Sequence, residues 1–335
     1  MTEDRPKPPR PQAVPAASPA TTVATIAAVL VVLAAVAVVL LLQDASEPPG
    51  GRPGAPTTVP APPSSGATPT RTEPLPPTPT LPSPTAPPPP SCPTPTPVQL
   101  TVLTFNIHFG VGHGRGGLDR IAEEIRAWQP DVVLLQEVDK GRPVSGNVDQ
   151  AAALGEKTGL HHAYGGNSRN TGAGPRGNAI LSRFPITAAG NTHLPMAGGR
   201  ELRGLLHARL DVGGVPVSVY ATHFDHRSRD ARRVAAQTAV GIMAADPLPK
   251  IFGGDLNTGP DGRPLTILRA AGLGDAWAVG KGKGATVPAD RPGSRIDFIL
   301  HDGWFTPLQA EVLYSDVSDH RPVWTRMQLQ PPPAC

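Results

Sequence analysis

The same order of residue types occurs twice in the chain. In the first occurrence an apolar run at residues 98–105 ends in Asn106, a helix-like stretch covers residues 118–128, and a second apolar run at residues 131–135 leads to Glu137. A strand, a helix and a strand in this order are typical of a right-handed crossover between two parallel strands. The first occurrence therefore predicts one such unit.

The second occurrence follows the same plan. Residues 215–221 form an apolar run before His223, residues 229–243 are helix-like, and residues 250–252 lead to Asp255. In units of this kind, ligands bind beyond the carboxyl ends of the parallel strands. We therefore expect the polar side chains at the four strand ends to meet at one site, built from two related halves of an α/β domain.

The segment before this domain has a different composition. Residues 23–42 are 20 almost wholly apolar residues, which as a helix would be roughly 30 Å long and could cross a bilayer. We predict a transmembrane helix, because the alternative, a cleaved signal peptide, usually has an apolar core of about 7–15 residues. Basic residues precede the run and acidic ones follow it. The positive-inside rule then predicts a single-pass protein of the cell membrane, with residues 1–22 in the cytoplasm and the rest outside.

Residues 43–97 are expected to be a disordered linker. Proline fills 21 of these 55 positions, with Thr, Ser, Gly and Ala between the prolines. Such a composition cannot bury enough apolar surface to fold, and it favours an extended, semi-rigid chain. The remaining residues, 98–335, are predicted to form one domain, which we expect to act as a monomer.

Three further polar clusters follow strands or lie within them. Asn257 comes two residues after Asp255, and the pair Asp319 and His320 precedes the last apolar run. Asp297 lies inside an apolar strand pattern, where a buried carboxylate needs a partner, and His320 is a candidate for it. Each cluster alone could be a turn, a cap or a surface ion pair. Their common position at strand ends favours one shared site.

The oxygen-bearing members of this set predict a metal ion. Asn106, Glu137 and Asp319 offer hard oxygen ligands, which suit Mg²⁺, Mn²⁺ or Ca²⁺ better than zinc. Such an ion would neutralise phosphate oxygens and the charge that develops on a leaving oxygen. The set therefore supports metal-assisted hydrolysis of a phosphate ester.

The remaining side chains have the chemistry that this hydrolysis needs. We expect Asp255 to orient or deprotonate the attacking water and Asn257 to donate a hydrogen bond to a phosphoryl oxygen. His320, held by Asp297, and His223 would contact the phosphate or act as acid and base.

At this point the chain resembles a known family. Its segments are similar to those of the endonuclease/exonuclease/phosphatase superfamily, which has the fold of deoxyribonuclease I, and they occur in the family's order. The resemblance implies a four-layered α/β sandwich, in which two packed β-sheets are flanked by helices. It also implies the metal and catalytic roles given above. The segments are LTFNIH, LLQEV, GNAILSRFPI, ATHFDH, GGDLNT, SRIDFIL and SDHRPV.

The same resemblance implies further substrate-binding residues. Arg203 is similar to a phosphate-contacting arginine, and Asn178 is expected to support the substrate site. Asp225, two residues after His223, is not a general position of the family; it either lines the substrate site or begins the next helix. Tyr164 is a candidate for a tyrosine that some members carry.

The resemblance also implies that the first and last strands are neighbours. Cys92 and Cys335 flank the predicted domain, and disulfides persist outside the membrane. We therefore predict a Cys92–Cys335 disulfide; the alternative is two free thiols.

Other functions have less support in the sequence. Residues 112–117 match G-x-G-x-x-G, the pattern of a dinucleotide-binding loop. The match begins six residues past Asn106 rather than at the strand end, and the second half of the repeat lacks it, which disfavours a dinucleotide-binding protein. No G-x-S-x-G or H-E-x-x-H motif occurs, which disfavours a serine hydrolase and a zinc protease. A non-catalytic surface binding domain stays an alternative, although every expected polar position is filled.

The substrate is left open between nucleic acid, phospholipid and a small phosphodiester. The net charge of +3 is small for a nucleic-acid binder, and the aromatic content of 4% leaves few stacking platforms. A lipid or phosphoinositide phosphatase, or a sphingomyelinase-like phosphodiesterase, is the alternative to a nuclease.

Overall fold

Both predicted repeats form crossovers of parallel strands. The computed structural model describes residues 96–111, 117–167 and 174–331. Strand β1 (Val98–Asn106), helix α2 (Gly117–Trp128) and strand β2 (Val132–Asp139) make the first unit. Strand β7 (Val215–His223), helix α4 (Arg229–Ala244) and strand β8 (Lys250–Asp255) make the second. In each unit the two strands pair in parallel.

Each unit lies at the centre of a six-stranded sheet. The first sheet has the order β11-β12-β1-β2-β4-β3, and the second has the order β5-β6-β7-β8-β10-β9. The two sheets therefore have the same plan, with the parallel pair third and fourth. The other strands of the first sheet are β3 (His161–Gly166), β4 (Arg176–Ser182), β11 (Phe305–Val312) and β12 (Val323–Leu329). Those of the second are β5 (Ile186–Leu194), β6 (Arg203–Val212), β9 (Gly274–Asp275) and β10 (Asp297–His301).

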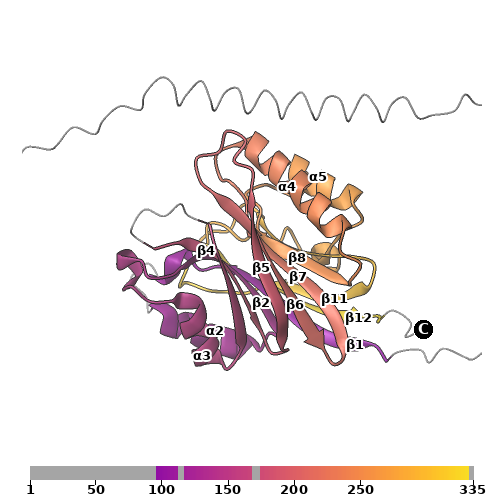
Figure 1. The fold of residues 1–335 in the computed structure, drawn as a ribbon, viewed down its shortest axis with the longest axis horizontal. Helices are drawn as coiled ribbons and strands as arrows, with labels where there is room; N and C mark the ends of the chain where they lie inside the picture. Colours follow the sequence, from indigo (N-terminus) through magenta and orange to yellow (C-terminus); the bar gives the residue numbers. More distant parts are fainter. Residues whose placement is uncertain (1–95, 112–116, 168–173, 332–335) are drawn as a thin grey trace, which may run out of the picture. The chain divides into compact units, whose positions relative to one another are not determined.

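The sheets pack face to face, with helices on both outer sides. Helices α2 and α3 (Gln150–Thr158) cover the first sheet, and α4 and α5 (Arg263–Ala270) cover the second (Figure 1). Successive side chains of a strand point to opposite faces, so each sheet has one face toward the other sheet and one face toward its helices. Leu134 and Val219 contribute to the cluster between the sheets, whereas Leu135 and Phe252 pack in the clusters under the helices. The predicted four-layered sandwich is confirmed.

The first and last strands are antiparallel neighbours, as the resemblance implied. Val98 pairs with Leu329 at the open end of this ladder. The predicted cytoplasmic tail, membrane helix and disulfide, and the linker up to residue 95, lie outside the described residues. Within the described residues, no helix has the length and apolarity to cross a membrane.

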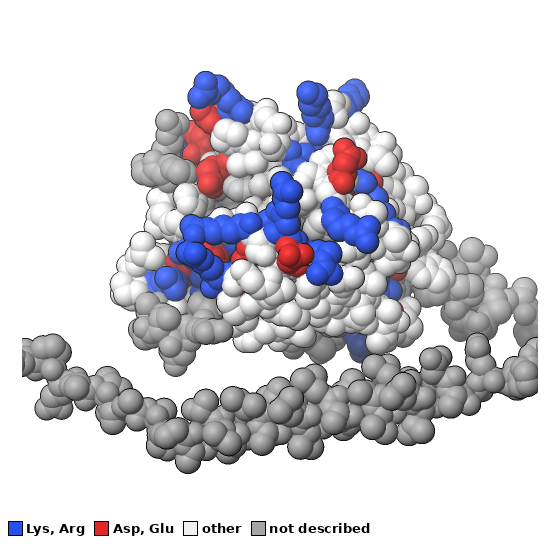
Figure 2. Space-filling model, turned by 90° about the horizontal axis from the view of Figure 1, so that it is seen from above, with Lys and Arg blue, Asp and Glu red and all other residues white. Residues whose placement is uncertain are grey.

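Charge on the molecular surface is mixed in sign. Figure 2 shows Lys and Arg in several separate groups on one face, with Asp and Glu among them. Among the described residues seen on this face, the basic side chains form no unbroken band.

Candidate active site

The four predicted strand ends meet at the junction of the two sheets. Asn106 ends β1 in the first sheet, and Asp255 ends β8 in the second. The Asn106 Nδ2 atom lies 3.2 Å from Asp255 Oδ2 and 3.3 Å from Glu137 Oε1. His223, which ends β7, pairs with Asp255 in the register of the second sheet. The structure therefore brings these four side chains together.

Asp255 is at the centre of this group. Its Oδ2 atom lies 3.3 Å from His223 Nε2 and 3.7 Å from His320 Nε2, in addition to the contact with Asn106. Its other oxygen, Oδ1, accepts a hydrogen bond of 2.9 Å from the backbone N–H of Asn257. The carboxylate is 2% exposed, so protein groups rather than water define its surroundings.

His320 and Asp297 form the predicted pair. The distance between His320 Nδ1 and Asp297 Oδ2 is 2.9 Å, and both residues are buried. Thr286 donates a second hydrogen bond, of 2.6 Å, to the same oxygen. This arrangement fixes the imidazole ring and leaves its Nε2 atom facing Asp255.

Asn257 joins the site through its side chain. Its Nδ2 atom lies 3.0 Å from His223 Nε2 and donates to the backbone oxygen of Phe224 at 3.0 Å.

Two residues of the site have positive backbone φ angles. The φ of Asn257 is +49°, and that of Glu137 is +56°. Positive φ is costly for residues other than glycine, and such conformations cluster at functional sites. At Glu137 the β2–β4 pairing also shifts register between Leu135 and Val138, which is the local reason that this side chain leaves the strand pattern.

Burial and charge separate the proton affinities of the site groups. Burial and the neighbouring Asp297 carboxylate raise the pKa of Asp255 to about 7. Burial lowers the pKa of His223 well below its usual value, and the positive charge of Arg203 adds to this. Burial also opposes the charged form of His320, but Asp297 and Asp255 outweigh it and raise the pKa of His320 to about 10. In the metal-free chain, a neutral and a charged histidine therefore flank Asp255.

The donor set fits a hard divalent cation. Asp255, Asp297 and His320 have ligand atoms within 4.8 Å of one another. The Asp297 Oδ1 atom is buried and has no hydrogen-bond partner among the described residues, and the Asp255 and Glu137 carboxylates both approach the Asn106 amide. Buried carboxylates so close together repel one another, and a bound cation relieves that repulsion.

Asp319 lies at the edge of this group. Its carboxylate is 43% exposed, and Oδ1 lies 3.5 Å from His108 Nδ1. The neighbouring Ser318 ties the loop to the site, since its Oγ atom donates to the backbone oxygen of Asn106 at 2.7 Å. Of the three predicted metal ligands, Asn106 and Glu137 are in direct contact, whereas no contact joins Asp319 to either side chain.

The expected substrate-binding residues have different surroundings. Arg203 and Asn178 line a cavity beside the site. Asp225 does not line it; its Oδ1 accepts hydrogen bonds from the backbone N–H groups of Arg227 and Ser228, in the turn that leads to α4. The helix itself is capped by Ser228, so Asp225 stabilises the turn before the helix. Tyr164 does not line the cavity either, and its hydroxyl donates to the backbone oxygen of Pro175 at 3.1 Å.

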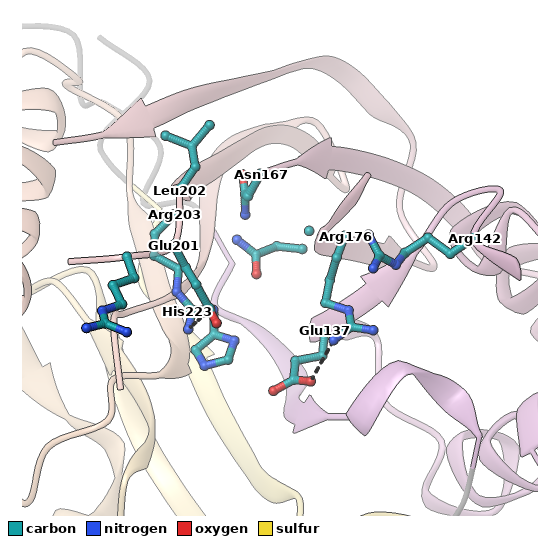
Figure 3. Close-up of a pocket in the computed structure, with 11 residues that line it drawn as sticks. Glu137, Arg142, Asn167, Arg176, Glu201, Leu202, Arg203 and His223 are labelled. Carbon is teal, nitrogen blue, oxygen red and sulfur yellow. Dashed lines mark ion pairs between the residues drawn. The ribbon is translucent and has the colours of Figure 1, made fainter. Parts of the chain in front are cut away.

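The cavity also contains side chains that the sequence did not single out. Its volume is about 390 Å³, and it shares Glu137 and His223 with the reaction centre. Figure 3 shows Arg142 and Arg176 on one side of it and Glu201, Arg203 and His223 on the other. Four arginines line the cavity: Arg142, Arg176, Arg200 and Arg203.

A comparison with protein families identifies the chain. Residues 103–320, more than half of the sequence, match the Endonuclease/Exonuclease/phosphatase family. The chain belongs to this family. Membership makes it a phosphoric ester hydrolase, the enzyme class that the sequence predicts.

The chain is also similar to individual proteins. The chain is 27% identical over 244 residues to the protein named Uncharacterized protein YbhP of Escherichia coli (strain K12), which covers 68% of this chain and 96% of that protein. It is 28% identical to an endonuclease/exonuclease/phosphatase structure from Beutenbergia cavernae, with a TM-score of 0.59 and 71% and 73% of the two chains covered. The mannosyl-6-phosphatase Bt3783 of Bacteroides thetaiotaomicron matches at 21% identity and a TM-score of 0.56, covering 68% of this chain and 99% of that one. At that identity, the last match shows the fold alone.

Proposed function

We propose that the protein is a divalent-metal-dependent phosphoesterase that hydrolyses its substrate with an activated water. The position of Asp255 carries this proposal. One buried carboxylate oxygen faces Asn106, His223 and His320, which come from three different segments of the chain. A water held by this oxygen would lie among the groups that hydrolysis requires.

Asp255 and His320 have complementary proton chemistry. A carboxylate whose pKa is raised to about 7 by burial and by Asp297 can take a proton from water near neutral pH. His320, with its pKa raised to about 10, carries a proton that it can give to the leaving oxygen or share with the phosphate. Asp297 supports the charged imidazole at 2.9 Å.

Asn257 and His223 complete the proposed phosphate contacts. The Asn257 amide is held by its bond to the Phe224 backbone, so little reorganisation is needed when charge grows on a phosphoryl oxygen. Neutral His223 keeps a nitrogen available for hydrogen bonding.

Glu137 and Asn106 are the residues we propose to hold Mg²⁺ or Mn²⁺, with Asp319 as a further ligand. When bound, the ion would supply charge neutralisation to the phosphate and the leaving group. Hard oxygen donors also accept Ca²⁺, so the choice of ion is part of the assay.

The test is metal-dependent hydrolysis by the purified full chain. The substrates are plasmid DNA, bis(4-nitrophenyl) phosphate, a phosphoinositide and sphingomyelin, which separate the substrate classes. We expect hydrolysis of at least one substrate with Mg²⁺ or Mn²⁺, and loss of it in Asp255→Ala. Asp230→Ala is the control, because Asp230 is an exposed residue of α4. Equal rates for wild type and Asp255→Ala on every substrate would contradict the proposal.

We further propose that residues 23–42 anchor the enzyme in the cell membrane, with the catalytic domain outside. The support is the apolar run and the distribution of charge around it. Full-length protein should sediment with membranes, and the domain should be digested by protease added to intact cells. A chain lacking residues 23–42 should be found in the soluble fraction. Protection of the domain until the cells are lysed would contradict this orientation.

A further inference from the structure

We propose that the arginine-lined cavity binds a second anionic group of the substrate, separate from the phosphate that is hydrolysed. This inference rests on the proposed function, because it places the scissile phosphate at Asp255. The cavity shares Glu137 and His223 with that centre. A single substrate could therefore occupy both places.

One buried carboxylate positions two of the four arginines. Asp139 is fully buried, and its oxygens accept from Arg176 Nε at 2.7 Å and Arg176 Nη2 at 3.2 Å. The same carboxylate lies 3.5 Å from Arg142 Nε. Arg142 also donates to the backbone oxygen of Gly174 at 3.0 Å. These contacts hold both guanidinium groups in place before any ligand arrives, which lowers the cost of ordering them on binding.

The opposite wall contributes the other two arginines. Arg200 lies in the segment before β6, and Arg203 is the first residue of that strand. Arg203 Nη2 is 2.6 Å from Glu201 Oε2, and the Arg203 side chain is only 13% exposed. Its Nε atom, like that of Arg142, is buried and has no hydrogen-bond partner among the described residues. Donors of this kind favour an additional acceptor.

The balance of charge matches a phosphate dianion. Four guanidinium groups line the cavity, and two carboxylates, Asp139 and Glu201, are paired with them. The third nearby carboxylate, Glu137, lies 3.8 Å from Arg176 Nη1, and we leave it out of the count because it is assigned to the metal, whose charge would offset it. Four positive charges less two negative charges leave an excess of two. A phosphate monoester carries about −1.5 to −2 at pH 7, and arginine recognises it through paired N–H donors.

The size of the cavity restricts the substrate further. A volume of about 390 Å³ is in the range of small-molecule sites and holds a compact group rather than a duplex. We therefore infer a polyol or sugar phosphate that bears a second phosphate on another carbon. The same chemistry occurs in a free bisphosphate and in the headgroup of a phosphorylated inositol lipid.

The test is a binding comparison in the full chain carrying Asp255→Asn, which prevents turnover during the titration. Calorimetry is performed in detergent with D-myo-inositol 1,4-bisphosphate and with D-myo-inositol 1-phosphate. We expect the bisphosphate to bind at least about tenfold more tightly, because only it can place one phosphate at the reaction centre and another on the arginines at the same time. In Arg142→Gln/Arg200→Gln the preference should fall below about threefold.

Two further variants separate charge from folding. Arg142→Lys/Arg200→Lys keeps both positive charges and should recover part of the preference. Arg209→Gln removes an exposed arginine of β6 and should leave the preference intact. Melting temperatures of all variants show whether they fold.

Several results would overturn the inference. Equal affinities for the two inositol phosphates would do so. So would a loss of affinity in the Gln variant that is as large for the monophosphate as for the bisphosphate, because the arginines would then hold the reacting phosphate. If wild type hydrolyses none of the assayed substrates but the Asp255→Asn chain still prefers the bisphosphate, the second anion site stands and only the catalytic proposal is refuted.

Vesicles containing phosphatidylinositol 4-phosphate or phosphatidylinositol distinguish the source of the bound group. A preference seen only on vesicles assigns a lipid headgroup, and one seen in solution assigns a free bisphosphate.

Discussion

The Nδ1 atom of His320 lies 2.9 Å from Oδ2 of Asp297, although 23 residues separate them in the chain. Asp297 is the first residue of β10, and His320 lies in the loop before β12. The pair therefore connects the two sheets beside Asp255. If Asp297 acts through His320, the two side chains form one functional unit.

This unit predicts non-additive effects on the rate. His320→Ala and Asp297→Asn should each lower kcat by about 10²–10⁴, the range for loss of a general acid or base. If Asp297 acts by orienting His320, the double variant should be no slower than His320→Ala alone. Steady-state kinetics on the best substrate, with melting temperatures to verify folding, tests this. Multiplied effects in the double variant would show that the two residues act independently.

Metal binding should stabilise the folded chain. A ligand present at about 100 times its Kd adds roughly 2.7 kcal/mol when it binds only the native state. Addition of Mg²⁺ or Mn²⁺ to chelator-treated protein should therefore raise the melting temperature. Glu137→Gln should reduce this rise, whereas Glu156→Gln, an exposed position in α3, should not. A melting temperature that neither ion changes would count against the assigned ligands.

One histidine outside the site predicts a pH dependence of stability. Burial lowers the pKa of His207; Asp246 opposes this shift, and Arg209 adds to it. The ring stacks on Tyr220 with 4.5 Å between centroids, and its Nε2 atom lies 3.0 Å from Ser218 Oγ. Because the folded state binds this proton less readily than the unfolded state, its contribution to stability is complete above about pH 6.5 and is lost as the pH falls below that value.

The variant His207→Phe isolates this effect, since phenylalanine keeps an aromatic ring beside Tyr220 and cannot titrate. Urea unfolding at about pH 7 and about pH 5 gives the free energy of unfolding at each pH. Wild type should lose more stability between these values than the variant does. An identical loss in both proteins would rule out His207 as a source of the dependence.

The Cys92–Cys335 disulfide stays a prediction with a clear test. Val98 pairs with Leu329 in the β1–β12 ladder, and each cysteine is six positions beyond one of these residues. Peptide mapping without reductant should recover the two cysteines in one linked fragment. Removal of a native disulfide costs roughly 2–5 kcal/mol in small secreted domains, so Cys92→Ser should also lower the melting temperature. Two thiols that react freely with an alkylating reagent would exclude the bridge.

The sequence predicts the crossover units closely, because their periodicity is local. The expected helix at 229–243 corresponds to α4 (Arg229–Ala244), and the strand that leads to Asn106 is β1. The proximity of Asn106 and Glu137 follows from this as well, since Asn106 ends β1 and pairs with Gln136, the residue before Glu137 in the parallel neighbour β2. Local pattern and the general rule for such sheets are sufficient for that part of the site.

The arginine-lined cavity could not be predicted in the same way. Arg176 begins β4 and Arg203 begins β6, and these strands belong to different sheets. Their approach depends on how the sheets pack, which alternation along one strand does not specify. Asp139 gave a partial signal, because a buried carboxylate at the end of β2 needs a basic partner. The role of Asp225 was open because a short polar residue before a helix can equally bond the backbone of a turn or face a ligand.

The equal strand order of the two sheets has a practical consequence for truncated forms of the protein. The first crossover supplies Asn106 and Glu137, and the second supplies His223 and Asp255. A fragment ending in the β6–β7 turn would lack β11 and β12 of the first sheet as well as His223 and Asp255. Limited proteolysis in that turn should therefore abolish turnover completely once the fragments separate, and mixing the two fragments should restore it only if they reassociate.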